Sequence, residues 1–344
     1  MENLLLYAGS VLIWGSTWFA ITFQLGEVAP QVSLVYRYAI ASAVLFAWCL
    51  VRRRSLRFDL ASHGYFLGLG ALLFGINYYC TYHAQLYISS ALNCIAFSSL
   101  VWLNILNSRW LLGTRVEWQT YLGAGIGVAG ILVLFWPQVQ ELSLSDRTLL
   151  GASFSLAGAL TASFGNILSQ RGQKRGFPVL QSNAWGMFYG TVLLGLFALA
   201  SGAPFTFERT VSYVVSLLYL AVFGSVIAFG CYLTLIGRIG AHRAGYSVVM
   251  FPVVALVLSA LFEGLHIDAN IVIGVGLALA GNVVILSVAG ETKRRGGGKA
   301  ALAPSSGPGE GKAVPAPFSG RGEGKPAPAS SSVLVPADKK RVAI

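Results

Sequence analysis

Two stretches of this sequence, one in each half of the chain, carry the clearest indication of its architecture. Ser89 to Phe135 reads SSALNCIAFSSLVWLNILNSRWLLGTRVEWQTYLGAGIGVAGILVLF, and Gly240 to Leu286 reads GAHRAGYSVVMFPVVALVLSALFEGLHIDANIVIGVGLALAGNVVIL. Each has a long apolar segment, a short polar turn and a glycine-rich apolar segment, and they align without a gap at an offset of 151. Three glycine pairs then coincide: Gly113 with Gly264, Gly123 with Gly274, and Gly130 with Gly281. The alignment predicts an internal duplication.

The composition around these stretches indicates a membrane protein. Of the 344 residues, 55% are hydrophobic and 11% are charged, and the mean hydropathy is +0.67. A soluble domain carries about 25% charged residues, because its surface must be hydrated. So few charges cannot cover a water-facing surface, which argues against a soluble enzyme. The formal net charge of +11 would otherwise suggest nucleic acid, but in a membrane chain we expect no nucleic-acid partner.

Ten apolar segments are long enough for a helix to cross the hydrocarbon core, which takes roughly 20 residues. They are residues 4–23, 34–51, 64–82, 91–112, 119–136, 149–170, 180–201, 212–234, 244–262 and 269–289. The runs are continuous, whereas the strands of a membrane barrel alternate. The sequence therefore predicts an all-α membrane protein with ten transmembrane helices in two five-helix repeats, 1–136 and 149–289. Because five is odd, the two repeats would cross the membrane in opposite senses.

Basic residues gather in alternate connections between these segments. They are Arg52, Arg53, Arg54, Arg57, Arg109, Arg115, Arg171, Lys174, Arg175, Arg238 and Arg243. The positive-inside rule then places these connections and both termini in the cytoplasm. No cleavable signal peptide is evident after Met1-Glu2-Asn3.

The last 55 residues, 290–344, have a different composition. They are rich in Gly, Pro, Ala and Ser and hold ten of the 24 Lys and Arg residues. Such a segment cannot bury enough apolar area to offset its ordering entropy, so we expect a disordered, basic cytoplasmic tail. Two roles stay open for it, which are a weak contact with anionic lipid or an inert extension.

Several short motifs resemble the drug/metabolite transporter superfamily, specifically its EamA-type ten-span members. In order, they are Trp14-Gly15-Ser16-Thr17-Trp18-Phe19, Arg37, Ser89-Ser90-Ala91-Leu92, Val249-Met250-Phe251-Pro252-Val253-Val254-Ala255, Phe262-Glu263-Gly264, and the glycine-rich fifth and tenth segments. One departure is Gly113-Thr114-Arg115, where the family often has Gly-Glu. The resemblance covers about residues 4–289. It implies export of small metabolites, commonly amino acids or related compounds, by alternating access across a bacterial inner membrane.

Arg37 is a basic residue that the positive-inside rule does not account for. It lies a few residues inside the second segment, on the side without a basic cluster. A cation at that depth is costly, at roughly 2.5–3.5 kcal/mol on insertion scales, so it is a candidate for binding a substrate carboxylate. The alternative is an arginine that snorkels or bonds to nearby carbonyls.

Two aromatic pairs at helical spacing predict the wall of a substrate pocket. Trp14 and Trp18 are four residues apart in the first segment, and Tyr78 and Tyr82 are four apart in the third. Tyrosine at depth needs a hydroxyl partner, which favours a bundle interior or wet cavity over lipid. Ordinary helix packing is the alternative.

Further polar or helix-breaking residues at depth complete the candidate substrate site. They are Asn93, Ser98, Asn166 and Pro252. The asparagines and the serine have a competing role in hydrogen bonds between helices, and the proline in a purely structural kink.

The sequence predicts no enzyme, no metal and no cofactor. The four cysteines lack ligand spacing, and no Asp or Glu lies well inside a segment, so proton coupling through a carboxylate is doubtful. The expected partners are a small-molecule substrate and the lipid bilayer, and small-residue helices would allow a homodimer. The alternatives to amino-acid export are a multidrug or quaternary-amine exporter and a non-transporting receptor or assembly subunit.

Overall fold

The computed structural model describes residues 1–140, 145–262 and 268–301, and within these ranges the chain is helical and contains no strand. The α-helices are α1 (Glu2–Thr22), α2 (Pro30–Val51), α3 (Leu60–Leu69), α4 (Asn77–Tyr87), α5 (Ser90–Phe97), α6 (Leu100–Leu112), α7 (Trp118–Leu134), α8 (Trp136–Gln140), α9 (Asp146–Lys174), α10 (Val179–Ala200), α11 (Val211–Tyr219), α12 (Ala228–Ile239), α13 (Ala241–Ala244), α14 (Ser247–Phe262) and α15 (Ala269–Ala301). Two π-helical segments, η1 (Gly70–Ile76) and η2 (Leu220–Ile227), join α3 to α4 and α11 to α12.

Each of the ten predicted segments falls on one helix or on a run of consecutive helices. Six are long and apolar enough to span a membrane by themselves, namely Glu2–Thr22, Pro30–Val51, Leu60–Tyr87, Asp146–Lys174, Val179–Ala200 and Val211–Ile239. The other four are shorter or interrupted in the described chain, so the count of ten crossings stays a prediction. Helix α15 continues to Ala301, past the expected end at residue 289, and residues 302–344 of the expected tail lie outside the described residues.

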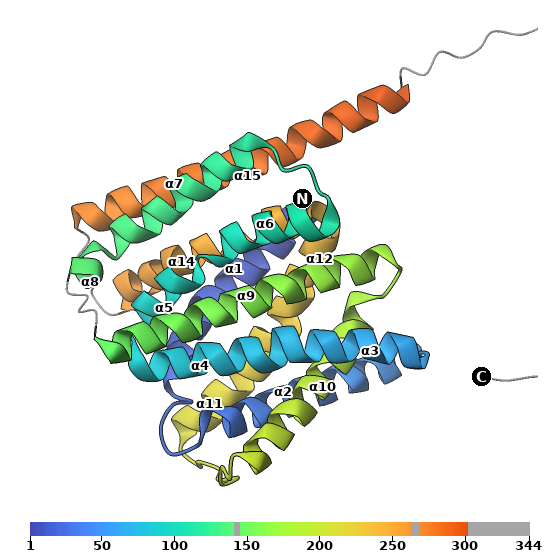
Figure 1. Cartoon of the computed structure of the whole chain (residues 1–344), viewed down its shortest axis with the longest axis vertical. Coiled ribbons are helices and arrows are strands. Elements are labelled where there is room, and N and C mark those ends of the chain that lie inside the picture. Colours follow the sequence, from blue (N-terminus) through green and yellow to red (C-terminus); the bar gives the residue numbers. More distant parts are fainter. Residues whose placement is uncertain (141–144, 263–267, 302–344) are drawn as a thin grey trace, which may run out of the picture. The chain divides into compact units, whose positions relative to one another are not determined.

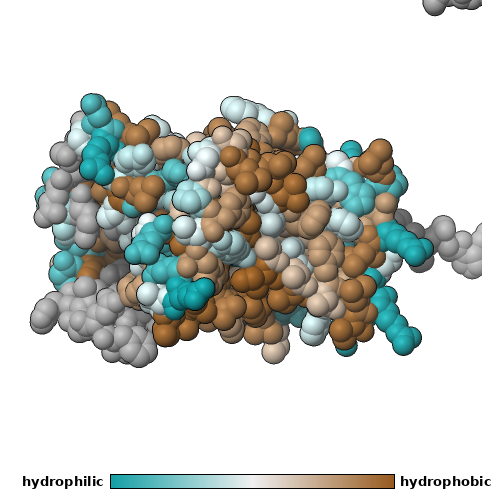
Figure 2. Space-filling model, turned by 90° about the horizontal axis from the view of Figure 1, so that it is seen from below, coloured by the Kyte–Doolittle hydropathy of each residue, from teal (hydrophilic) through white to brown (hydrophobic). Residues whose placement is uncertain are grey.

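The surface of the helices is strongly apolar. Leu4, Leu12, Phe19, Trp48 and Leu196 are each more than half exposed. On the face shown in Figure 2, hydrophobic residues dominate the middle and most hydrophilic residues lie toward the two ends. Helices satisfy their own backbone hydrogen bonds, which a segment in lipid requires, and exposed apolar side chains are then stable there. The fold is that of an all-helical membrane protein.

The π-helical segments occupy equivalent places in the two halves. Segment η1 begins at Gly70 and η2 at Leu220, an offset within one residue of the offset found in the sequence. In a π-turn the hydrogen bond reaches one residue further than in an α-helix, and such turns often occur at functional sites. At Gly70 an added Cβ would lie 2.8 Å from the carbonyl oxygen of Gly186 on α10, so only glycine permits this close helix contact.

Helices from the two halves pack against one another throughout. Helix α2 packs on α10, α1 packs on α12 and α14, and α9 packs on α4, α5 and α6. Helices α7 and α15 lie side by side (Figure 1) and approach closely where Gly130 meets Gly274 and where Gly123 meets Gly281. Small residues at such crossings let helix backbones approach, which gives close packing in lipid.

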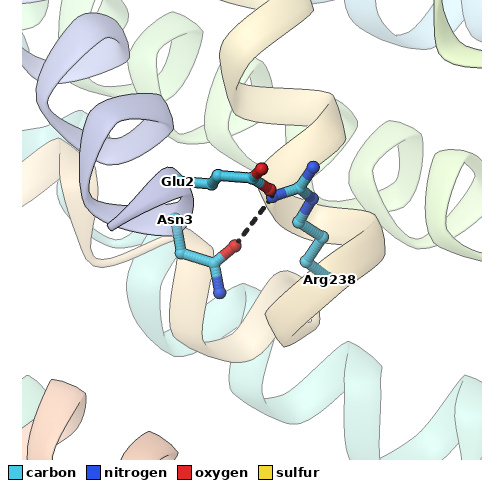
Figure 3. A network of polar contacts seen from close by, with 3 residues as sticks. All are labelled: Glu2, Asn3 and Arg238. Atoms are coloured by element: carbon cyan, nitrogen blue, oxygen red, sulfur yellow. Dashed lines mark hydrogen bonds and ion pairs between the residues drawn. The ribbon is translucent and has the colours of Figure 1, made fainter.

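Ion pairs bring the basic connections to one end of the molecule. Arg238, in the last turn of α12, reaches Glu2 at 2.8 Å and Asn3 at 3.2 Å at the start of α1 (Figure 3). Arg243 lies 3.6 Å from Glu117, which precedes α7. The N-terminus therefore lies at the same end as the connections before α7 and after α12.

Two hydrogen bonds show that the remaining basic connections lie at the same end of the helices. Arg171, near the end of α9, donates to the carbonyl oxygen of Leu111 at the end of α6. Trp185, near the start of α10, donates to the carbonyl oxygen of Leu56 before α3. The four arginine-bearing connections thus share one end of the helices, as their charges predicted.

Candidate functional site

A cavity lies where helices from both halves converge. Its walls come from α1, η1, α4, α5 and α6 of the first half and from α9, α12 and α14 of the second. About 60 Å³ inside it is open to water-sized molecules. Since a buried water needs at least about 10–15 Å³ measured this way, the cavity has room for a few waters.

Seven of the sixteen residues that line the cavity are aromatic. They are Trp14, Trp18, Tyr78, Phe97, Phe229, Tyr232 and Phe251. Trp14 is at the centre of this wall, because its ring centroid lies 4.9 Å from Phe229, 5.0 Å from Tyr232 and 5.7 Å from Phe251, all edge to face. Such edge-to-face pairs are the geometry that aromatic quadrupoles favour.

The π-helical segment η2 fixes the orientation of Trp14. The indole Nε1 donates to the carbonyl oxygen of Gly224 at 2.9 Å, inside η2. A buried indole N–H needs an acceptor, and this one is supplied by the backbone of the other half. The indole N–H is thus satisfied outside the cavity, and the ring serves as its wall.

Two asparagines supply amide groups to the cavity from opposite halves. Asn77 begins α4 directly after η1, and its Nδ2 donates to the carbonyl oxygen of Leu73 at 3.2 Å. Asn166 lies on α9, and its Nδ2 donates to Tyr232 Oη at 3.1 Å and to Asn104 Oδ1 at 3.3 Å. Both residues are at least 95% buried, and the Oδ1 atom of each has no hydrogen-bond partner in the structure.

Arg37 lies behind the cavity wall, not in it. It is 1% exposed, and its Nε donates to Ser225 Oγ at 2.9 Å and its Nη1 to Tyr82 Oη at 3.2 Å. Its Cζ lies 4.6 Å from the ring centroid of Tyr78, which is a wall residue. Among the described residues no carboxylate lies within ion-pair distance of Arg37. The guanidinium therefore joins α2 and α4 to η2 through neutral groups.

The structure brings four of the predicted site residues together at the cavity. Trp14, Trp18, Tyr78 and Asn166 line it, whereas Tyr82 does not line it and accepts a hydrogen bond from Arg37. Tyr82 is fully buried, so the predicted pair of Tyr78 and Tyr82 divides between the wall and the layer behind it.

The other three predicted residues are buried but do not line the cavity. Asn93 donates to the carbonyl oxygen of Thr81 at 3.1 Å, and Ser98 donates to that of Ile95 at 2.6 Å, where α5 ends. Pro252 lies inside α14 next to Phe251. Because proline has no N–H, the carbonyl of Val248, a wall residue, lacks its usual α-helical donor.

Asn77, Phe229 and Tyr232 are wall residues that the sequence interpretation did not select for the site. Phe229 and Tyr232 are three apart, which is a same-face spacing that would have identified them. Asn77 is polar at depth, but nothing in its local sequence separates it from the other asparagines of the spans. In the described part of the chain no three His, Cys, Asp or Glu side chains are placed to hold a metal.

Solved and curated proteins resemble this chain over most of its length. A solved crystal structure superposes with a TM-score of 0.71 at 21% identity and covers 84% of this chain and 98% of its own, which shows the shared fold. The uncharacterized transporter YoaV of Bacillus subtilis (strain 168) is 25% identical over 272 residues, covering 78% of this chain and 91% of the relative.

Two further relatives come from Escherichia coli (strain K12). The uncharacterized inner membrane transporter YedA is 27% identical over 249 residues, covering 72% of this chain and 78% of the relative. A probable amino-acid metabolite efflux pump is 23% identical over 288 residues, covering 80% of this chain and 90% of the relative.

The model of the EamA-like transporter family matches this chain twice, at residues 2–136 and 149–287. The two matches begin and end close to the two repeats expected from the sequence. The apolar helices and these relatives identify a multi-pass transport protein of the inner membrane. This chain therefore belongs to the EamA-like transporter family.

Proposed function

We propose that this chain exports small organic metabolites, amino acids or close chemical relatives of them, across the inner membrane by alternating access. The observation that carries the proposal is the cavity, whose walls come from corresponding helices of the two family matches. Counted along the chain, they are the first, third and fourth spans of one half and the first, third and fourth of the other. A site between repeats is the arrangement that transporters of this design use.

The chemistry of the cavity supports a small amphipathic substrate. Aromatic rings offer apolar contact, and Asn77 and Asn166 offer a few polar atoms among them. Ligand sites commonly combine mostly apolar walls with a small number of polar groups that fix orientation. An amino acid with an apolar side chain combines one apolar part with a few polar groups, which matches this lining. The efflux pump among the relatives is named for amino-acid metabolites.

Alternating access follows from the proposed ten spans and the inverted relation of the halves. If the repeats cross the membrane in opposite senses, exchanging their conformations opens the cavity to the other side. The matching positions of η1 and η2 support this symmetry. We infer that the end bearing the arginine-rich connections and the N-terminus faces the cytoplasm, because basic residues are retained there.

A second candidate is an exporter of quaternary amines, because aromatic walls also bind such cations. Reconstituted protein should separate the two. Proteoliposomes loaded with an unlabelled amino acid are expected to take up the labelled form by counterflow, whereas liposomes without protein are not. If no amino acid exchanges and quaternary amines do, the second candidate replaces the first. If nothing exchanges, the transporter proposal fails.

A matched pair of tryptophan variants tests whether the substrate passes through the cavity. Trp14→Leu removes the central wall residue, and Trp118→Leu removes a tryptophan that is 67% exposed at the start of α7. We expect the first variant to lose most of the counterflow and the second to retain it. Equal flux in both would mean that the substrate passes elsewhere.

A further inference from the structure

A basic pocket lies where α6 ends and the chain turns toward α7, at the end of the molecule that carries the arginine-bearing connections. Its lining residues are Arg109, Gly113, Thr114, Arg115 and Val116, and none of these five is acidic. About 380 Å³ in it is open to water-sized molecules. Ligand pockets commonly have roughly 300–1,000 Å³. The pocket therefore has room for a ligand and offers it two positive charges.

The two arginines of the pocket are available to bind an external anion. Within the described part of the chain, neither guanidinium takes part in an ion pair or a hydrogen bond. Three other arginines at the same end, Arg171, Arg238 and Arg243, are each bonded to the protein. The acid nearest in the chain is Glu117, which lies 3.6 Å from Arg243. Its charge is therefore already balanced by another arginine.

The carbonyl groups at the end of α6 are partly bonded within the protein. Free carbonyls there would carry partial negative charge and repel an anion. The carbonyl oxygen of Ser108 accepts from the backbone N–H of Thr114 at 3.1 Å, and that of Leu111 accepts from Arg171. Gly113 makes the turn with φ +62, and no atom beyond its chain neighbours lies within 4 Å of an added Cβ. The turn thus leaves open space beside the two arginines.

Exposed tryptophans indicate that the pocket lies at the depth of the lipid headgroups. Trp110, next to Arg109, is 72% exposed, and Trp118, at the start of α7, is 67% exposed. Tryptophan is enriched at the membrane–water interface, where its ring meets the headgroups. A phospholipid whose chains stay in the bilayer can therefore bring its phosphate to this pocket.

We propose that this pocket binds the phosphate headgroup of an anionic phospholipid of the cytoplasmic leaflet. Guanidinium groups bind phosphate oxygens through paired N–H donors, and the hydroxyl of Thr114 can donate a further hydrogen bond. Basic pockets beside cytoplasmic helix ends suit anionic headgroups, whereas the positive-inside rule alone would be met by arginines anywhere in the connection. The inference concerns a second ligand and does not depend on which solute is transported.

Native mass spectrometry of the full chain in a non-ionic detergent measures this binding. Phosphatidylglycerol and phosphatidylcholine with the same acyl chains compete at equal concentration, and we expect the wild type to retain phosphatidylglycerol. Arg109→Gln combined with Arg115→Gln should weaken its binding about 25-fold, and each single variant about fivefold. Because a ligand of the folded state stabilises it, phosphatidylglycerol should also raise the unfolding temperature of the wild type more than that of the double variant.

Arg54→Gln combined with Arg57→Gln is the matched control. It removes the same charge from exposed residues of the connection before α3, which do not line the pocket. We expect this control to retain phosphatidylglycerol as the wild type does. The single variants at Arg109 and Arg115 keep the test decisive if the double variant does not fold.

Three results would overturn the proposal. Equal losses in the two double variants would mean that net charge, and not this pocket, attracts the lipid. Equal retention of both lipids by the wild type would remove the preference itself. Displacement of phosphatidylglycerol by glycerol phosphate at the same concentration would make the pocket a site for soluble phosphates. All of these measurements can be made whether or not the protein transports amino acids.

Discussion

Replacing Arg37 with methionine is the most informative single perturbation of the region behind the cavity. Methionine keeps an unbranched apolar chain but removes the charge and all five N–H donors. The hydrogen bonds to Ser225 and Tyr82 disappear, and so does the contact with the ring of Tyr78. The substitution tests whether this buried cation acts on the substrate or only holds helices together.

The effect on stability should be small, because two large contributions oppose each other. Two hydrogen bonds from a charged donor contribute about 1.5–3 kcal/mol each, and the ring contact about 0.5–2 kcal/mol. Burying the guanidinium costs several kcal/mol, which methionine avoids. We expect the free energy of unfolding to change by no more than about 2 kcal/mol.

The effect on substrate affinity is estimated from the position of Tyr78. The guanidinium lies 4.6 Å behind the ring centroid, and a ligand in contact with the other face would lie about 3.5 Å beyond it. At a separation of about 8 Å and an effective dielectric constant of about 20, a carboxylate is attracted by about 2 kcal/mol. Arg37→Met should then weaken binding of an amino acid about thirtyfold.

Counterflow and calorimetry with phenylalanine and phenethylamine check this estimate. The amine lacks the carboxylate, so Arg37→Met should not weaken its binding. Arg37→Lys should restore part of the amino-acid affinity, and Arg57→Met, at an exposed residue of the connection before α3, should behave as wild type. Unchanged amino-acid affinity and flux in Arg37→Met would refute the electrostatic role and leave Arg37 a structural residue.

Three further predictions concern stability. Gly130→Ala should lower it by about 1–3 kcal/mol, because a Cβ there would meet the backbone nitrogen of Ala278 at 2.7 Å; thermal unfolding in detergent measures this. Burial, with a smaller contribution from the neighbouring charge, lowers the pKa of His242 to about 4. Between about pH 6.5 and 4 the unfolded chain thus binds more protons, and stability should fall by up to about 3 kcal/mol as the pH falls through this window. Glu2→Gln should change stability by less than about 1 kcal/mol, because the ion pair with Arg238 is exposed.

The first two of these predictions each have a control variant, and the third has an outcome that would contradict it. Gly276→Ala adds the same methyl group where no atom of a neighbouring helix lies within 4 Å, so it should not lower the unfolding temperature. His242→Gln should remove the loss of stability between pH 6.5 and 4, and an unaltered pH profile would show that another group titrates. A large loss in Glu2→Gln would mean that this ion pair contributes more than its exposure allows.

The positions of the helices and the clustering of the basic connections could be predicted from the sequence alone. Apolar length marks a membrane helix whatever its neighbours are, and arginines in alternate connections imply a common side. The contacts of Arg238 and Arg171 agree with that pattern. The family, too, was evident from motifs and the repeat.

Only the packed helices show which buried polar residues line the cavity and which bond to other parts of the protein. Arg37 is behind the cavity, Asn77 faces it, and Asn93 bonds to a neighbouring backbone, yet all three are buried polar residues in apolar segments. A soluble helix shows its buried side by its apolar stripe, but a membrane helix is apolar all round, so its sequence does not indicate which side faces the interior. Helix rotation, and with it the identity of the cavity wall, is set by contacts between segments far apart in the chain, such as Trp14 with Gly224.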